Sequence, residues 1–127
     1  MDYVQYMKDI KFTPRFEFME AADVEFARQG TRVCVAGVVI EDDRHKTKSN
    51  PRKFSNVKLD SNGMIIQVTC WTEVWSQISE LMSEAGTKVM IVTGQVKFSD
   101  FYGMNVIETF DRSKVKSELE IINFGGI

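Results

Sequence analysis

A basic run and an aromatic turn are the segments of this chain best suited to chemistry with a polyanion. The run Arg44–Lys53 carries five fixed positive charges and no acidic residue, although the whole chain has a net charge of -2. The turn Phe98–Gly103 places three aromatic residues among polar residues and glycine. Clustered cations neutralise phosphates, and accessible aromatic rings stack on bases. Together, the two segments predict a site for single-stranded nucleic acid.

Other side chains extend this candidate site along the strands between the two segments. A stacked base contributes about 1 to 3 kcal/mol whatever its identity, so binding by cations and rings predicts a weak sequence preference. Polar side chains on the same face could add hydrogen bonds, although any solvated sheet face carries such residues. The candidate nucleic-acid-binding residues are Arg44, Lys46, Lys48, Arg52, Lys53, Phe54, Lys58, Gln67, Thr69, Trp71, Lys97, Phe101 and Tyr102.

Several of these residues also have a purely structural interpretation. A basic loop is usually only solvated, and its position between two strands is what favours contact with phosphate. Trp71 lies on the outer face by alternation, but it could instead pack under Trp75. Alternation from Val96 places Phe98 inside the barrel, so Phe101 and Tyr102 are the better stacking residues.

The elements that would position these residues are short strands. Arg32–Ile40 is rich in β-branched residues, and Gly37 predicts a bend or bulge within it. Phe54–Leu59 and Ile65–Trp71 alternate on either side of Asp60–Gly63, which predicts a hairpin. The alternation directs one set of residues inward: Val57, Leu59, Ile66, Val68 and Cys70.

The remaining elements are one helix and two further strands. Apolar residues at helical spacing follow Thr72, the expected N-cap, and Gly86 follows the end of this helix. Lys88–Phe98 and Met104–Phe110 are the expected fourth and fifth strands. This order predicts an all-β fold with at least one helix: a five-stranded OB-fold Greek-key barrel whose helix lies between strands three and four.

Three segments divide the chain in this interpretation. Residues 1–30 form an N-terminal extension whose aromatic residues pack on the barrel or supply an oligomer or partner interface. A helix is possible from Glu20 to Gln29. Residues 31–112 form the OB-fold domain, and residues 113–127 form a C-terminal helix or strand and a tail.

Blocks of sequence within the barrel resemble a known family. Across roughly residues 31 to 110, the chain is similar to the OB domain near the C-terminus of bacterial DNA polymerase III alpha subunits, within the tRNA-anticodon-binding type of OB domain. This resemblance implies single-stranded DNA as the ligand, in a stand-alone protein or a polymerase-derived domain. The blocks are Val33–Val39, Lys46–Lys48, Leu59–Gly63, Ile66–Trp75 and Val92–Val96.

Composition narrows the remaining classes of function. Cys34 and Cys70 each lie in an apolar strand pattern with only His45 as an imidazole partner, which predicts buried free thiols, no metal and no cofactor. No catalytic constellation is present, so we expect a binding protein rather than an enzyme. The absence of a signal-like start and of a long apolar run predicts an intracellular, cytoplasmic protein that does not enter membranes.

Two other functions remain open from the sequence. The same face could dock a protein partner in a replication assembly or a second copy of the chain. It could also bind RNA in the anticodon-binding manner, because stacking alone does not distinguish ribose from deoxyribose. For the DNA-binding interpretation, we expect a role in DNA replication, recombination or repair.

Overall fold

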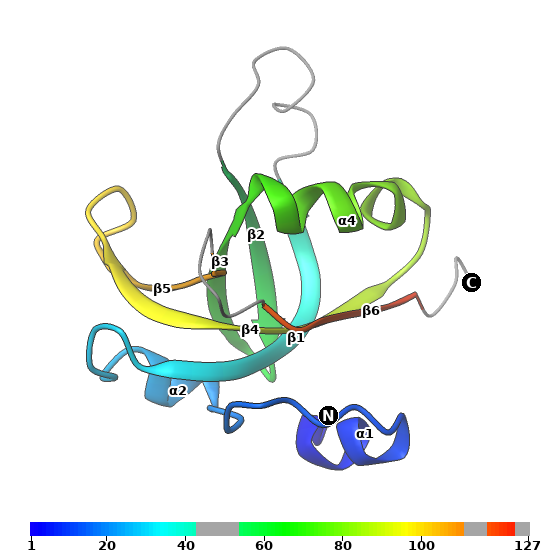
Figure 1. The fold of residues 1–127 in the computed structure, drawn as a ribbon, viewed down its shortest axis with the longest axis horizontal. Coiled ribbons are helices and arrows are strands. Elements are labelled where there is room, and N and C mark those ends of the chain that lie inside the picture. The colour runs from blue at the N-terminus through cyan, green and yellow to red at the C-terminus, as the bar shows by residue number, and fades with distance from the viewer. Residues whose placement is uncertain (43–53, 111–116, 124–127) are drawn as a thin grey trace.

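Five strands close into a barrel in the computed structural model, which describes residues 1–42, 54–110 and 117–123 (Figure 1). The strands are β1 (Arg32–Asp42), β2 (Phe54–Ser61), β3 (Met64–Trp71), β4 (Lys88–Ser99) and β5 (Met104–Glu108). They follow the order β1-β2-β3-β5-β4, and β4 pairs with β1 to close the ring. Only β3 and β5 run parallel. This arrangement, with one helix between β3 and β4, confirms the predicted OB-fold barrel.

The inside of the barrel is apolar because every second residue of its strands points inward. The predicted inward residues of β2 and β3 are all buried, and Leu59 and Val68 are fully enclosed. Helix α4 (Thr72–Ser83) lies across one end of the barrel (Figure 1). It adds a stripe of buried residues at helical spacing to the same core: Val74, Trp75, Ile78 and Met82.

The start of α4 differs from the expected capping pattern. The helix begins at Thr72, so Trp71 and not Thr72 occupies the N-cap position. Strand β3 runs into the helix without an intervening residue, which places the cap on the last residue of the strand. No side chain among the described residues caps the start of α4. The backbone N–H of Trp71 donates to Thr109 Oγ1 at 3.0 Å, which ties the end of β3 to the residue that follows β5.

Strand β1 is long enough to belong to two parts of the barrel. Its first part pairs with β4, and from Val38 onward it pairs with β2. A Cβ atom on Gly37 would lie 2.9 Å from Leu59 Cβ and 3.0 Å from the Asp60 carbonyl oxygen. Glycine is therefore needed at position 37, where β2 lies close to β1. The register shift between β1 and β2 comes a few residues later, between Val39 and Glu41.

The N-terminal segment packs on the outside of β1 and β4. Helix α1 (Tyr3–Asp9) buries Tyr3 and Met7 there, and Phe18 forms an isolated parallel bridge with Cys34. A second apolar cluster results, which is separate from the barrel interior. These contacts bring aromatic residues of the extension against the barrel, while Phe26 stays exposed.

The helix considered for Glu20–Gln29 is much shorter in the structure. Helix α2 covers only Ala21–Val24. The Asn105 side chain donates from Nδ2 to the carbonyl oxygens of Val24, Glu25 and Ala27 at 2.9 to 3.2 Å. A side chain of β5 therefore satisfies the carbonyls that a longer helix would have used, which ends the helix early.

Of the helix and the strand considered for the C-terminal segment, the structure has a strand. Strand β6 (Leu119–Asn123) pairs antiparallel with the first half of β4. Strands β5 and β6 pair with different halves of β4 along the same edge, and β1 pairs with the other edge. Within the described part of the chain, the helices are too short and too polar to cross a membrane.

Both cysteines are free and buried, as predicted. Burial raises the pKa of each thiol to about 12, with a further contribution from the Glu118 charge at Cys34. Because the thiolate is the reactive form and a raised pKa removes it at neutral pH, neither thiol is expected to react with DTNB at pH 8 in the native state. Two equivalents should react after denaturation in guanidinium, and rapid labelling of the native protein would contradict this expectation.

Candidate nucleic-acid interface

The hairpin of β4 and β5 carries the aromatic turn away from the barrel core (Figure 1). Phe98 is 50% exposed, which corrects the expectation that it points inside. The side chain of Val96 is still buried in the barrel core. Beyond Val96, β4 pairs only with β5, and no core residue in the described part of the chain covers the side chain of Phe98. The backbone N–H of Phe98 instead donates to Gln29 Oε1 at 2.5 Å, which links the hairpin to the segment after α2.

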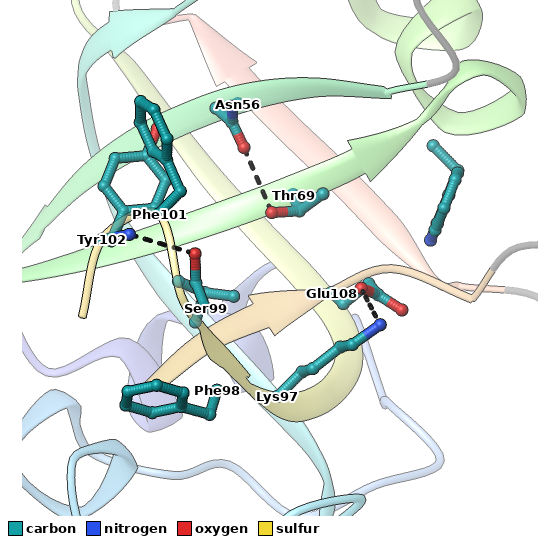
Figure 2. A pocket seen from close by; sticks show the side chains of 10 residues that line it. Asn56, Thr69, Lys97, Phe98, Ser99, Phe101, Tyr102 and Glu108 are labelled. Atoms are coloured by element: carbon teal, nitrogen blue, oxygen red, sulfur yellow. Dashed lines mark hydrogen bonds and ion pairs between the residues drawn. The ribbon is translucent and has the colours of Figure 1, made fainter. Parts of the chain in front are cut away.

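A pocket of about 400 Å³ lies where this hairpin meets the outer face of β2 and β3. Figure 2 shows side chains from these elements around it. The volume falls within the range of about 300 to 1,000 Å³ that is usual for ligand sites. Its lining residues are Asn56, Thr69, Trp71, Lys97, Phe98, Ser99, Phe101, Tyr102, Val106 and Glu108.

Two neighbouring rings form one wall of this pocket. Phe101 and Tyr102 meet edge to face, with ring centroids 4.9 Å apart. The turn is fixed by the backbone N–H of Tyr102, which donates to Ser99 Oγ at 3.2 Å, and by that of Gly103, which donates to the Ser99 carbonyl at 2.7 Å. Phe101 remains 87% exposed. A large apolar ring held in this position has an accessible face for stacking.

The outer face of the β2–β3 hairpin forms the polar side of the pocket. Asn56 and Thr69 are opposite each other in the ladder, and Thr69 Oγ1 donates to Asn56 Oδ1 at 3.1 Å (Figure 2). Trp71 also lines the pocket and is half-buried, whereas Trp75 is buried in the core. The outward position predicted for Trp71 is therefore the one that the structure has.

Each candidate cation in the described part of this face has an acidic neighbour. Lys97 Nζ lies 3.3 Å from Glu108 Oε2, and Lys58 Nζ lies 3.2 Å from Glu41 Oε2. The Lys97 side chain is 58% exposed and the Glu108 side chain only 13%. The Lys97 ammonium group is therefore accessible to a phosphate, whereas the Glu108 carboxylate is largely covered and would be costly to leave without a partner.

A smaller pocket of about 60 Å³ adjoins the first one. Glu41, Lys58 and Gln67 line it, and Asn56 and Tyr102 border both pockets. Gln67 is buried although its position in the strand places it on the outer face. Its amide therefore lies beneath the surface of this face rather than projecting from it.

The structure brings part of the predicted site together. Thr69, Trp71, Lys97, Phe101 and Tyr102 line the large pocket, and Lys58 and Gln67 line the small one. Phe54 pairs with Trp71 through the backbone of β2. Five predicted residues lie outside the described residues: Arg44, Lys46, Lys48, Arg52 and Lys53.

The list of candidate residues lacks five residues of the large pocket: Asn56, Phe98, Ser99, Val106 and Glu108. Strand alternation could have identified the last two, because Ile107 between them faces the core with 0% exposure. For the described residues, no group of three or more His, Cys, Asp or Glu side chains could hold a metal ion.

By sequence, no known protein family and no curated protein matches the chain. Solved structures do match it. A structure of the S. pombe Stn1-Ten1 complex has a TM-score of 0.54 at 15% identity, over 84% of this chain and 79% of that one. A replication protein A heterotrimer bound to ssDNA has a TM-score of 0.57 at 19% identity, over 89% of this chain and 27% of that one.

A third similar structure is a protein named OBody AM3L15, bound to hen egg-white lysozyme. Its TM-score is 0.55 at 16% identity, over 91% of this chain and 99% of that one. Identities this low bear on the fold and not on the ligand. The closed ring of five strands, the helix between β3 and β4 and these structural matches together establish that the chain is an OB-fold protein.

Proposed function

We propose that this chain binds single-stranded DNA on the face formed by β2, β3 and the β4–β5 hairpin. The observation that carries the proposal is the 400 Å³ pocket, which has accessible aromatic rings on one side and polar groups on the other. Bases separated from a partner strand expose their ring faces, whereas a duplex hides them. A site of this composition therefore favours the single strand.

Binding would follow from stacking and from charge. Phe101 and Trp71 offer ring surfaces to bases, while the exposed ammonium group of Lys97 would contact a backbone phosphate from its position beside Glu108. The basic segment Arg44–Lys53 would add further phosphate contacts from its place in the sequence between β1 and β2. Contacts of these kinds distinguish bases only weakly.

The comparisons support this proposal at the level of the fold. One structure of similar fold is described as bound to ssDNA, in a replication protein A heterotrimer. We extend the proposal to a role in DNA replication, recombination or repair, together with a protein partner from a replication assembly. The resemblance to polymerase III alpha subunits, and the choice between a stand-alone protein and a polymerase-derived domain, remain predictions. We also propose an intracellular binding protein without catalytic activity.

Fluorescence anisotropy with a labelled oligothymidine and a duplex of equal length tests the proposal. The single strand is expected to bind more tightly, and its affinity should fall as salt rises from 50 to 200 mM. For single strands, the slope of log affinity against log salt is about -0.7 for each phosphate neutralised. Absence of binding to the single strand at 50 mM salt would refute the proposal.

A matched pair of charge reversals identifies the cations responsible. Changing Lys46 and Lys48 to Glu should weaken binding and flatten the salt slope. Changing Lys8 and Lys11 to Glu alters the net charge equally, but these exposed residues lie in α1 and just after it, and Figure 1 shows α1 well away from the β4–β5 hairpin. Equal losses in the two variants would assign the effect to net charge rather than to the basic segment.

Binding to another protein is the second candidate function. It is favoured by the exposure of Phe98 and Phe101 on one hairpin and by an OB-fold match described as bound to lysozyme. Such a module would show no salt-sensitive binding to oligonucleotides. An RNA-binding module would be identified in the same anisotropy assay by tighter binding to oligouridine than to oligodeoxyuridine.

A further inference from the structure

Arg32 is an exposed cation at the start of β1 whose position is fixed by two aromatic rings. Its guanidinium carbon Cζ lies 5.9 Å from the centroid of the Phe16 ring and 5.7 Å from that of the Phe110 ring. The two rings pack against each other, with centroids 5.8 Å apart, and Phe110 is buried. Both distances to the guanidinium are within the range of cation–π attraction, so the rings hold this cation at one place on the surface.

Arg32 differs from its cationic neighbours because no carboxylate neutralises it. The side chain of Arg15 donates from Nε to Glu118 Oε1 at 2.6 Å, and Lys97 lies beside Glu108. For Arg32, the described part of the chain provides neither an ion pair nor a side-chain hydrogen bond. All five N–H donors of its guanidinium are therefore available to a ligand, and their planar fork matches the oxygens of a phosphate.

Strand pairing puts Arg32 on the same outer face as the large pocket. Arg32 is the ladder partner of Gln95 on β4, and Gln95 is in turn the partner of Glu108 on β5. Directly paired residues point to the same side of a sheet, so these side chains form a row that begins at the pocket and ends at Arg32. Two strand spacings, about 10 Å, separate its ends. The half-buried side chain of Gln95 lies between them.

We propose that Arg32 binds a backbone phosphate of a single strand that leaves the pocket and crosses the outer face of β4. This inference rests on the proposed function and extends the binding face from the β4–β5 hairpin to the start of β1. Lys97 lies two residues beyond Gln95 on the same face of β4, so the strand would meet Lys97 beside the pocket and Arg32 at the far end of the row. A phosphate contact adds affinity without a base preference.

Anisotropy titrations of labelled dT12 with Arg32→Met test this proposal. Methionine keeps an unbranched side chain against the two rings but removes the charge and all five donors. The affinity at 50 mM salt should fall about tenfold, as expected for the loss of a charge-assisted hydrogen bond. The slope of log affinity against log salt should become shallower by about 0.7, the value for one phosphate of a single strand. Circular dichroism checks that the variant remains folded.

Two further variants separate a phosphate contact from other causes. Lys8→Met also removes one positive charge, but from an exposed position in α1, which Figure 1 shows well away from the β4–β5 hairpin. It should leave the affinity and the slope close to those of the wild-type protein. Arg32→Lys keeps the charge in place, so it should keep the wild-type slope and bind dT12 more tightly than Arg32→Met does.

Three outcomes would overturn the contact at Arg32 while the proposed function stands. In the first, Arg32→Met binds dT12 with the wild-type affinity and slope. In the second, Arg32→Met and Arg32→Lys lose affinity equally and both keep the wild-type slope, because the side chain then only packs on the rings. In the third, Lys8→Met loses as much affinity as Arg32→Met, which assigns the effect to net charge. If the wild-type protein binds no single strand at 50 mM salt, the proposed function fails as well.

Discussion

Replacement of Phe101 by alanine is expected to weaken binding of oligothymidine by about 5- to 150-fold and to leave the melting temperature unchanged. The affinity loss corresponds to one stacked base, worth about 1 to 3 kcal/mol. Stability is unaffected because the ring is 87% exposed and contributes little to the core. Anisotropy titration gives the affinity, and thermal unfolding followed by circular dichroism gives the melting temperature.

Phe26→Ala provides the control for this experiment. Phe26 is 81% exposed, so it matches Phe101 in residue type and exposure, but it does not line the pocket. Its replacement should not change the affinity. Equal losses of affinity in the two variants would mean that exposed rings act nonspecifically. An unchanged affinity in Phe101→Ala would remove the aromatic turn from the binding face.

The second large effect is expected from Gly94→Ala, which should lower the free energy of unfolding by about 3 kcal/mol. A Cβ atom at this position would lie 2.6 Å from the Glu108 carbonyl oxygen and 2.9 Å from Ile107 Cγ2. Both neighbours are held in the β4–β5 ladder, so the strands must separate to admit the methyl group. Urea denaturation of the variant and the wild-type protein measures the difference.

Gly63→Ala separates the effect of space from the effect of backbone conformation. Gly63 has a φ of +91° in the β2–β3 turn, and a Cβ atom there would have no neighbour within 4 Å. Its replacement should therefore cost only the backbone strain, about 1 kcal/mol. If Gly94→Ala costs no more than Gly63→Ala, the contact between β4 and β5 is looser than these distances imply.

The two predictions test different parts of one interface. Phe101 acts at the exposed turn, whereas Gly94 sets the approach of β4 to the backbone of Glu108. Strand separation at Gly94 would also displace the carboxylate that lines the pocket.

The sequence by itself determined which segments form the barrel strands, the order of these strands along the chain and the place of the helix between β3 and β4. These features depend on local information: a period of two in β2 and β3, a change to helical spacing after Trp71, and residues at Asn62 and Gly63 that accept positive φ. The burial of Leu59 and Val68 followed from the same alternation. It also placed Trp71 and Thr69 on the outer face.

Only the tertiary structure decided which outer-face residues share a pocket. Glu108 lies beside Thr69 because β5 pairs in parallel with β3, and no local pattern encodes a pairing between strands so distant in sequence. Phe98 is exposed because the end of β4 extends beyond the barrel core, a limit that alternation cannot reveal. Helix α2 ends at Val24, where the side chain of Asn105, on β5, donates to the carbonyl oxygens of Val24 and Glu25. In each case a contact formed on folding decides what the local sequence pattern leaves open. The energy of strand pairing depends on neighbouring side chains that only the closed barrel brings together.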